Sequence, residues 1–114
     1  MDITCKQILE ALCKGFQADA AGDWKAIIQF SFAGDKGGDY YLEIGDGKCE
    51  LHEGQAENPT ATVKTQDQVW IDISLGKANP MTAFMTGKVS VGGHMGDIMK
   101  LQNRNIFKVS PPKD

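Results

Sequence analysis

The sequence predicts a single α+β domain in which helices cover one face of a five-stranded, predominantly antiparallel sheet. Three observations support this. The 114 residues suffice for one core but not for two, a helical apolar period opens the chain, and a period of two follows it. Helical patterns return in the last third, and such segregation of strands from helices is typical of α+β proteins. We therefore treat residues 1–114 as one domain.

The first predicted element is a helix that begins after Thr4. Thr4 and Gln7 have the spacing of a capping box, in which each side chain accepts a hydrogen bond from the other residue's backbone amide. Apolar residues from Cys5 to Phe16 then recur at helical spacing, and charged residues occupy the opposite side. The helix should have one buried face, and residues 20–23 should end it.

Four strands are predicted between residues 24 and 64. Apolar and polar residues alternate over 24–32, 40–44 and 48–52, and two glycine-containing turns separate these runs. Asn58–Pro59 breaks the pattern, which then resumes. An antiparallel meander is the simplest arrangement of four successive strands, and we expect that order.

Helices return in the last third of the chain. Thr65–Gln68 repeats the capping-box pattern, and Gly76 should lie at the end of the helix that follows. Asn79–Pro80 should begin another helix, with Asn as the cap and Pro at the first helical position. A short fifth strand, a glycine turn and a last helix are predicted within residues 88–101.

Composition and charge argue against several classes of function. A net charge of −3 with scattered basic residues provides no stripe for binding phosphates, so we expect no nucleic-acid partner. The longest apolar runs are far shorter than the roughly 20 residues that cross a bilayer. The first residues, Met1–Thr4, lack the basic segment with which a secretory signal begins. The last residues, Pro111–Asp114, do not contain a peroxisomal targeting tripeptide. We expect a cytoplasmic protein.

No set of residues has the spacing of a catalytic or metal site, so we expect no enzyme, no cofactor and no metal. Cys5, Cys13 and Cys49 form no Cys-x-x-Cys pair, which argues against a disulfide framework and a zinc site and predicts buried thiols. The two histidines stand far apart, and no serine lies in a Gly-x-Ser-x-Gly elbow. Residues 92–96 match no phosphate-binding fingerprint and should form a plain turn.

The last third is rich in methionine and aromatic residues. Methionine is flexible and polarizable, so it suits surfaces that accept variably shaped apolar cargo, but it also fills gaps in ordinary cores. Spacing alone does not separate these two interpretations. The residues concerned are Trp70, Met81, Phe84, Met85, Met95 and Met99.

The stretch from Gly76 to Leu101 resembles the signature of the sterol carrier protein 2 family, also called non-specific lipid-transfer proteins. Stretches 30–32, 40–47 and 61–65 fit the strands of that family, so the resemblance covers essentially the whole chain. It implies an apolar tunnel between sheet and helices that takes fatty acids, acyl-CoA esters, phospholipids or sterols. The ordered match runs through Gly76-Lys77, Pro80, Ala83-Phe84, Gly87-Lys88, Val89, Val91, Gly93, Met95-Gly96 and Met99-Lys100-Leu101.

The resemblance also implies which residues form the tunnel wall. Asp97–Ile98 stands where the family often has Leu-Ala, which places a carboxylate near the proposed mouth and favours an acyl chain over a sterol. Glycines within residues 92–96 flank the last helix, and we expect its displacement to admit cargo. The implied ligand-binding residues are Phe30, Phe32, Leu42, Ile44, Trp70, Ile73, Phe84, Met85, Ile98, Met99 and Leu101.

We therefore expect an intracellular lipid-binding or transfer protein that holds a fatty acid, fatty acyl-CoA or similar lipid, with transient membrane contact at most. Two alternatives stay open. A non-catalytic accessory or dimerisation module for lipid-metabolising enzymes would contact a protein, or a second copy in a homodimer, through the sheet face around Ile27 and Tyr41. A small enzyme would need a buried titratable group among the wall residues, for which Asp97 and His94 are the candidates.

Overall fold

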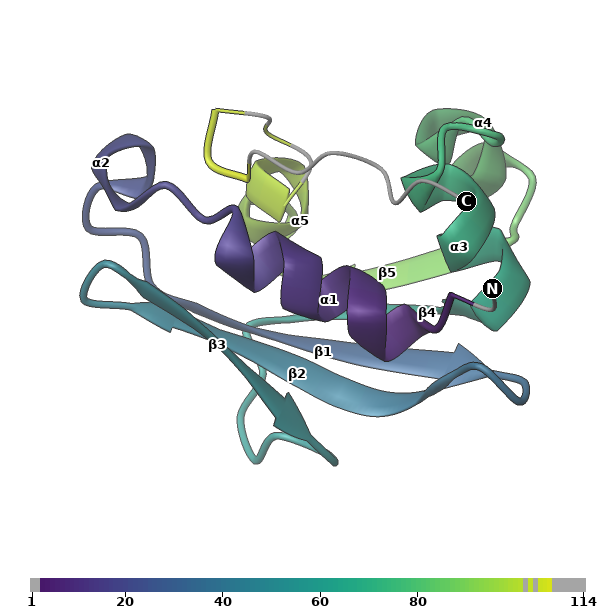
Figure 1. The fold of residues 1–114 in the computed structure, drawn as a ribbon, viewed down its shortest axis with the longest axis horizontal. Coiled ribbons are helices and arrows are strands. Elements are labelled where there is room, and N and C mark those ends of the chain that lie inside the picture. The colour runs from purple at the N-terminus through teal and green to yellow at the C-terminus, as the bar shows by residue number, and fades with distance from the viewer. Residues whose placement is uncertain (1–2, 102, 104, 108–114) are drawn as a thin grey trace.

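A sheet forms one layer of the computed structural model, and the helices lie on one face of it (Figure 1). The structure describes residues 3–101, 103 and 105–107. The predicted α+β class is confirmed. In chain order the elements are α1 (Cys5–Lys14), α2 (Ala18–Ala21), β1 (Ala26–Ala33), β2 (Gly38–Gly45), β3 (Lys48–Glu53), β4 (Ala61–Gln66), α3 (Asp67–Ser74), α4 (Pro80–Met85), β5 (Val89–Gly93) and α5 (Met95–Leu101).

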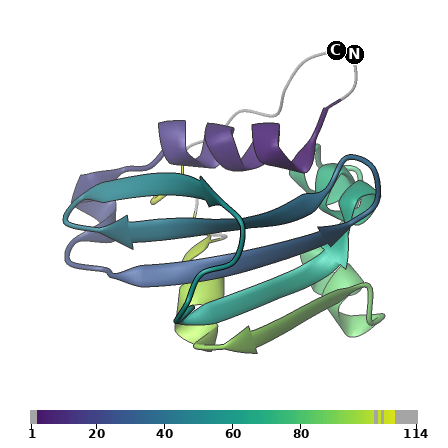
Figure 2. The same ribbon diagram turned by 90° about the horizontal axis from the view of Figure 1, so that it is seen from below.

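The sheet is mostly antiparallel, but its strand order corrects the predicted meander. The order is β3-β2-β1-β4-β5, so β4 pairs with β1 rather than with β3. This pairing is parallel and sets Ile28 opposite Ala61, whereas the other three pairs of strands are antiparallel. Figure 2 shows the connection from β3 to β4 passing across the sheet face that the helices leave uncovered.

The crossing connection is held by the side chain of Gln29 on β1. Gln29 accepts a hydrogen bond from the Ala56 amide at 2.7 Å and donates to the Gly54 carbonyl oxygen at 3.1 Å. At the end of the connection, the Thr60 amide donates to the Ile27 carbonyl oxygen at 2.7 Å. A meander would need a tight turn after β3. The chain instead has a longer loop, whose polar backbone groups find partners on β1.

Two of the three predicted helix starts are confirmed. Thr4 Oγ1 accepts from the Gln7 amide, and Gln7 Oε1 accepts from the Thr4 amide, which completes the capping box. Asn79 Oδ1 accepts from the amides of the first turn of α4. The capping box predicted at Thr65 is wrong because β4 continues to Gln66, and the Thr65 hydroxyl donates to the Lys88 carbonyl oxygen at 2.8 Å.

The start of the first predicted helix is confirmed, but its predicted end is wrong. Gly15 caps α1, and its amide donates to the Ala11 carbonyl oxygen, so the helix ends before the predicted stretch 20–23. A separate short helix, α2, follows.

The predicted alternation from Trp24 to Phe32 is confirmed, since every apolar residue on that side of β1 and in the approach to it is buried.

A close-packed core lies between α1 and the central strands. Leu9 on α1 and Ile28, Phe30 and Leu42 on the sheet are fully buried. Helix α1 packs against β2 and β3, whereas α3 contacts β4 and α4 contacts β5. The inner face of the sheet is therefore divided, with one half under α1 and the other under the C-terminal helices.

Candidate ligand cavity

An apolar cavity of about 610 Å³ lies over the half of the sheet that includes β4 and β5. This volume falls within the roughly 300–1,000 Å³ of typical small-molecule sites. None of the described residues that line it carries a charged side chain. The lining consists of Ile8, Ala11, Leu12, Val63, Trp70, Ile73, Ser74, Pro80, Met81, Phe84, Val89, Val91, Met95, Ile98, Met99, Leu101, Asn103 and Phe107.

The floor of the cavity is made of valines on β4 and β5. Val63 on β4 is paired with Val91 on β5, and both line the cavity together with Val89. Residues two apart on a strand point to the same face, so the alternation of β5 aims Val89 and Val91 inward. Their short branched side chains leave space that α3, α4 and α5 surround without filling.

The mouth of the cavity lies between α4 and α5. Four large apolar lining residues are also exposed to solvent: Met81 by 65%, Phe84 by 46%, Met95 by 48% and Met99 by 72%. A residue that both lines a cavity and contacts solvent marks the place where the cavity opens. The rim is therefore mostly apolar and dominated by flexible methionines, with one polar residue, Asn103.

Part of the wall set implied by the resemblance lines this cavity. These residues come from α3, α4 and α5, which lie far apart in sequence but surround one space. That they bind a ligand stays a prediction. They are Trp70, Ile73, Phe84, Ile98, Met99 and Leu101.

The remaining predicted wall residues are not part of the cavity lining. Phe30 and Phe32 lie behind Trp70, with ring centroids 5.4 and 5.3 Å from its indole, so they support the wall without lining it. Leu42 and Ile44 are buried on β2, which α1 covers.

Met85 also lies outside the lining. It is 78% exposed, because it follows Phe84 on α4 and faces away from the cavity. Consecutive helical residues point about 100° apart, so the two neighbours do not share a face.

Several lining residues were absent from the predicted set. Helix α1 contributes Ile8, Ala11 and Leu12 to the lining. The sequence showed that α1 has an apolar face, but it did not show which residues of that face would line the cavity. Ile8 and Leu12 are four residues apart, so they lie on one side of the helix. Fully buried Leu9 packs into the core instead. The helical period shows which residues of α1 share a side of the helix. Which side faces the cavity becomes clear only from the position of α1 on the sheet.

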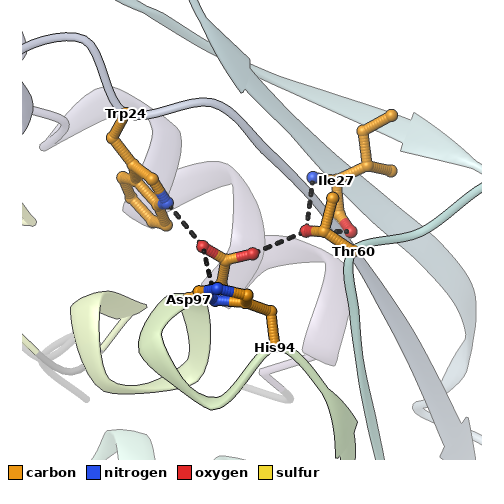
Figure 3. A network of polar contacts seen from close by, with 5 residues as sticks. All are labelled: Trp24, Ile27, Thr60, His94 and Asp97. Carbon is orange, nitrogen blue, oxygen red and sulfur yellow. Dashed lines mark hydrogen bonds and ion pairs between the residues drawn. The ribbon is translucent and has the colours of Figure 1, made fainter.

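The carboxylate of Asp97 lies away from the cavity mouth, in a buried polar network (Figure 3). Trp24 Nε1 donates to Asp97 Oδ1 at 2.8 Å, and Thr60 Oγ1 donates to Asp97 Oδ2 at 2.7 Å. His94 Nδ1 lies 3.7 Å from Asp97 Oδ1. Thr60 also accepts from the Ile27 amide at 3.1 Å, which connects the start of α5 to β1.

This network corrects the expected location of Asp97 near the mouth. Asp97 is only 6% exposed and does not line the cavity, because its carboxylate turns toward Trp24. His94 does not line the cavity either, and its side chain is 72% exposed. The buried titratable group that the enzyme alternative requires among the wall residues is thus neither of these two.

Two further properties concern the described part of the chain. Among those residues, no group of three or more His, Cys, Asp or Glu side chains could hold a metal ion. No helix formed by them has the length and apolarity needed to cross a membrane. The terminal residues Met1–Asp2 and 111–114, which entered the expectation of location, lie outside the described residues.

Comparisons with known proteins agree with the fold and the sequence resemblance. The chain is 31% identical over 85 residues to hydroxysteroid dehydrogenase-like protein 2 of Xenopus tropicalis, which covers 74% of this chain and 20% of that protein. It therefore spans about a fifth of the length of this relative.

Two solved structures share the fold. Palmitated SCP2L2 from Aedes aegypti has a TM-score of 0.66 at 16% identity, covering 87% of this chain and 91% of that one. The stereoselective inverting sec-alkylsulfatase Pisa1 from Pseudomonas sp. has a TM-score of 0.79 at 19% identity, covering 98% of this chain and 18% of that one. The model of the SCP-2 sterol transfer family matches residues 6–104. The match extends over nearly the whole chain, so this chain belongs to the SCP-2 sterol transfer family.

Proposed function

We propose that this chain is a lipid-binding and transfer domain that holds an acyl chain, as a fatty acid or fatty acyl-CoA, in the cavity whose mouth lies between α4 and α5. The observation that carries the proposal is an apolar space of about 610 Å³ with a mouth open to solvent. A close-packed interior would contain no such space. The proposed activity is physical exchange of cargo and involves no covalent step.

The lining favours a ligand whose polar end remains outside the cavity. Burying an unpaired carboxylate is costly, and none of the described lining residues carries a charge to compensate it. An acyl chain fits this pattern, since its apolar part can enter while the carboxylate or the CoA thioester stays at the mouth. Ser74 and Asn103 are polar, but Ser74 Oγ already donates to the Trp70 carbonyl oxygen at 2.8 Å.

The hydrophobic effect alone supplies enough free energy for useful binding. Burying about 14 methylenes at about 0.8 kcal/mol each yields roughly 11 kcal/mol. Association costs at least about 4 kcal/mol, so about 7 kcal/mol remains, equivalent to a dissociation constant on the order of 10 μM. Affinity in this range permits both uptake and release.

Entry of cargo should involve the rim methionines more than displacement of the whole last helix. The start of α5 is tied to the sheet, because the His94 amide donates to the Thr60 carbonyl oxygen at 2.8 Å and Asp97 holds Trp24. Met81 and Met99 are mostly exposed and have three rotatable side-chain bonds each, so they can move aside at low cost.

The first test is native mass spectrometry of the purified chain, followed by lipid extraction and titration of the delipidated protein with a fluorescent fatty acid. Phe84→Asp places a charge on the rim and should weaken binding by about tenfold or more, which corresponds to at least about 1.4 kcal/mol. Met85→Asp places the same charge one residue away, outside the lining, and should bind as the unmodified chain does. Equal affinity of both variants would contradict the proposal.

A second pair of variants tests the depth of the cavity without adding charge. Val91→Trp should fill part of the floor and shift the preference toward shorter acyl chains. Ser90→Trp adds the same side chain on the opposite, exposed face of β5 and should leave chain-length preference unchanged. Thermal melts of all variants separate loss of binding from loss of folding.

The size of the relatives favours a second candidate function, that of a non-catalytic accessory or dimerisation module. The chain spans only a fifth or less of Xenopus hydroxysteroid dehydrogenase-like protein 2 and of Pisa1. The surface for such contact would be the sheet face around Ile27 and Tyr41, where the Tyr41 ring stacks on His52 at 4.9 Å. Sedimentation of the delipidated chain tests for self-association. Failure to take up any fatty acid would favour this second function over the first.

A further inference from the structure

Two of the cysteines lie in contact although they are 36 residues apart in sequence. Cys13 is in the last turn of α1, and Cys49 is on β3, beside Ile44 of β2. Their Sγ atoms are 3.0 Å apart, and both residues are free thiols. Both side chains are half-buried, which corrects the expectation of buried thiols for this pair. The contact belongs neither to the cavity lining nor to the Asp97 network.

We propose that Cys13 and Cys49 are a redox modification site, at which a low-molecular-weight disulfide such as oxidised glutathione forms an intramolecular disulfide between α1 and β3. A disulfide has an S–S distance of about 2.05 Å, so the two sulfurs need to approach by about 1 Å. Cys13 is close to the end of its helix, which Gly15 caps, and small adjustments are easiest at a helix end.

The two thiols have different roles because a hydrogen bond joins them. The hydrogen bond between the two sulfur atoms lowers the pKa of Cys13, against the opposing effects of burial, Glu10 and Glu50. The same hydrogen bond, with burial, raises the pKa of Cys49. The thiolate is the nucleophile in disulfide exchange, so Cys13 attacks first and Cys49 resolves the intermediate.

The reaction proceeds in two balanced steps. The Cys13 thiolate attacks one sulfur of oxidised glutathione, which forms a mixed disulfide and releases one glutathione thiolate. Cys49 then loses its proton to solvent, and its thiolate attacks Cys13 Sγ, which breaks the mixed disulfide and releases the second glutathione thiolate. The protein loses two electrons and two protons, and one oxidised glutathione becomes two reduced glutathiones.

The third cysteine provides an internal control. Cys5 is fully buried, and burial together with Asp67 raises its pKa to about 12. Its Sγ donates to the Asp67 carbonyl oxygen at 3.7 Å rather than to another sulfur. Cys5 should therefore remain a free thiol under conditions that oxidise the pair.

The test is incubation of the folded chain with oxidised glutathione, followed by intact-mass measurement and thiol counting after denaturation. We expect the monomer to lose the mass of two hydrogen atoms and to keep one free thiol, which peptide mapping should locate at Cys5. Cys5→Ser should form the same disulfide. Cys13→Ser should retain an unreacted Cys49, and Cys49→Ser should stop at a mixed disulfide on Cys13.

A second readout measures the link in the folded state. Closing a loop of this size restricts the unfolded chain, so the oxidised protein should melt about 10 °C higher than the reduced protein, and a reductant should abolish the difference. The proposal would be overturned if all three thiols stay free, if the final product is a covalent dimer or a stable glutathione adduct, or if Cys5 forms the disulfide. Each outcome is independent of whether the cavity binds lipid.

Discussion

Replacing Asp97 by alanine should destabilise the fold, because it removes the shared acceptor of the buried polar network at the start of α5. Its carboxylate is buried and accepts hydrogen bonds from Trp24 at 2.8 Å and from Thr60 at 2.7 Å. Alanine removes both acceptors, which leaves the buried indole N–H without its partner. The loss therefore includes the cost of an unsatisfied donor as well as that of the missing bonds.

The expected loss can be estimated from these contacts. A hydrogen bond to a charged group contributes about 1.5–3 kcal/mol, and the two bonds share one carboxylate, so Asp97→Ala should cost about 3 kcal/mol. Asp97→Asn should cost only about 1 kcal/mol. Its carbonyl oxygen can still accept from Trp24, and its amide can donate to Thr60 Oγ1, whose hydroxyl can then donate to the Ile27 carbonyl oxygen at 3.2 Å.

Urea unfolding followed by Trp fluorescence measures both variants. With a slope of about 1.5 kcal/mol per molar urea, the alanine variant should unfold at about 2 M less urea than the unmodified chain. The asparagine variant should fall between the two. Equal losses for both variants would refute the hydrogen-bond explanation, and a loss below about 0.5 kcal/mol for alanine would refute the role of the network altogether.

Two further predictions concern backbone strain and thiol reactivity. Gly93 and Gly76 have φ of +80° and +79°, but a Cβ at Gly93 would meet the Thr60 carbonyl oxygen at 2.5 Å, whereas one at Gly76 would meet nothing within 4 Å. In urea unfolding, Gly76→Ala should cost about 1 kcal/mol and Gly93→Ala about 3 kcal/mol, and equal costs would contradict the steric argument. At about pH 8, iodoacetamide should modify Cys13 before Cys5, because burial raises the pKa of Cys5 to about 12 and keeps it protonated. Peptide mapping that found Cys5 modified first would oppose this reasoning.

Local features of the fold could be predicted because their causes lie within a few residues. The capping box of Thr4 and Gln7 and the Asn79 cap each involve a single helical turn. The partner of β4 could not be predicted in the same way. Its pairing with β1 depends on a connection held by Gln29, and Thr65 is unavailable as a cap because it bonds to Lys88, a residue 23 positions away.

The same limit applies to the candidate site. An inward apolar residue on a strand has the same sequence pattern whether it meets a helix or an empty space, so Leu42 and Val63 look alike until α1 is placed. Asp97 was expected near the mouth because Asp97–Ile98 stands where the family often has Leu-Ala. Its actual partner, Trp24, is 73 residues away and enters the network through the tertiary fold.

The parallel pairing of β1 with β4 has a consequence for how this protein can diversify. It places most of the close-packed core on one side of β1 and most of the cavity on the other. Substitutions in the valine floor and the methionine rim should alter the shape of the cavity while leaving the close-packed core intact. Selection, or a protein engineer, can thus change the shape of the cavity with few penalties in foldability.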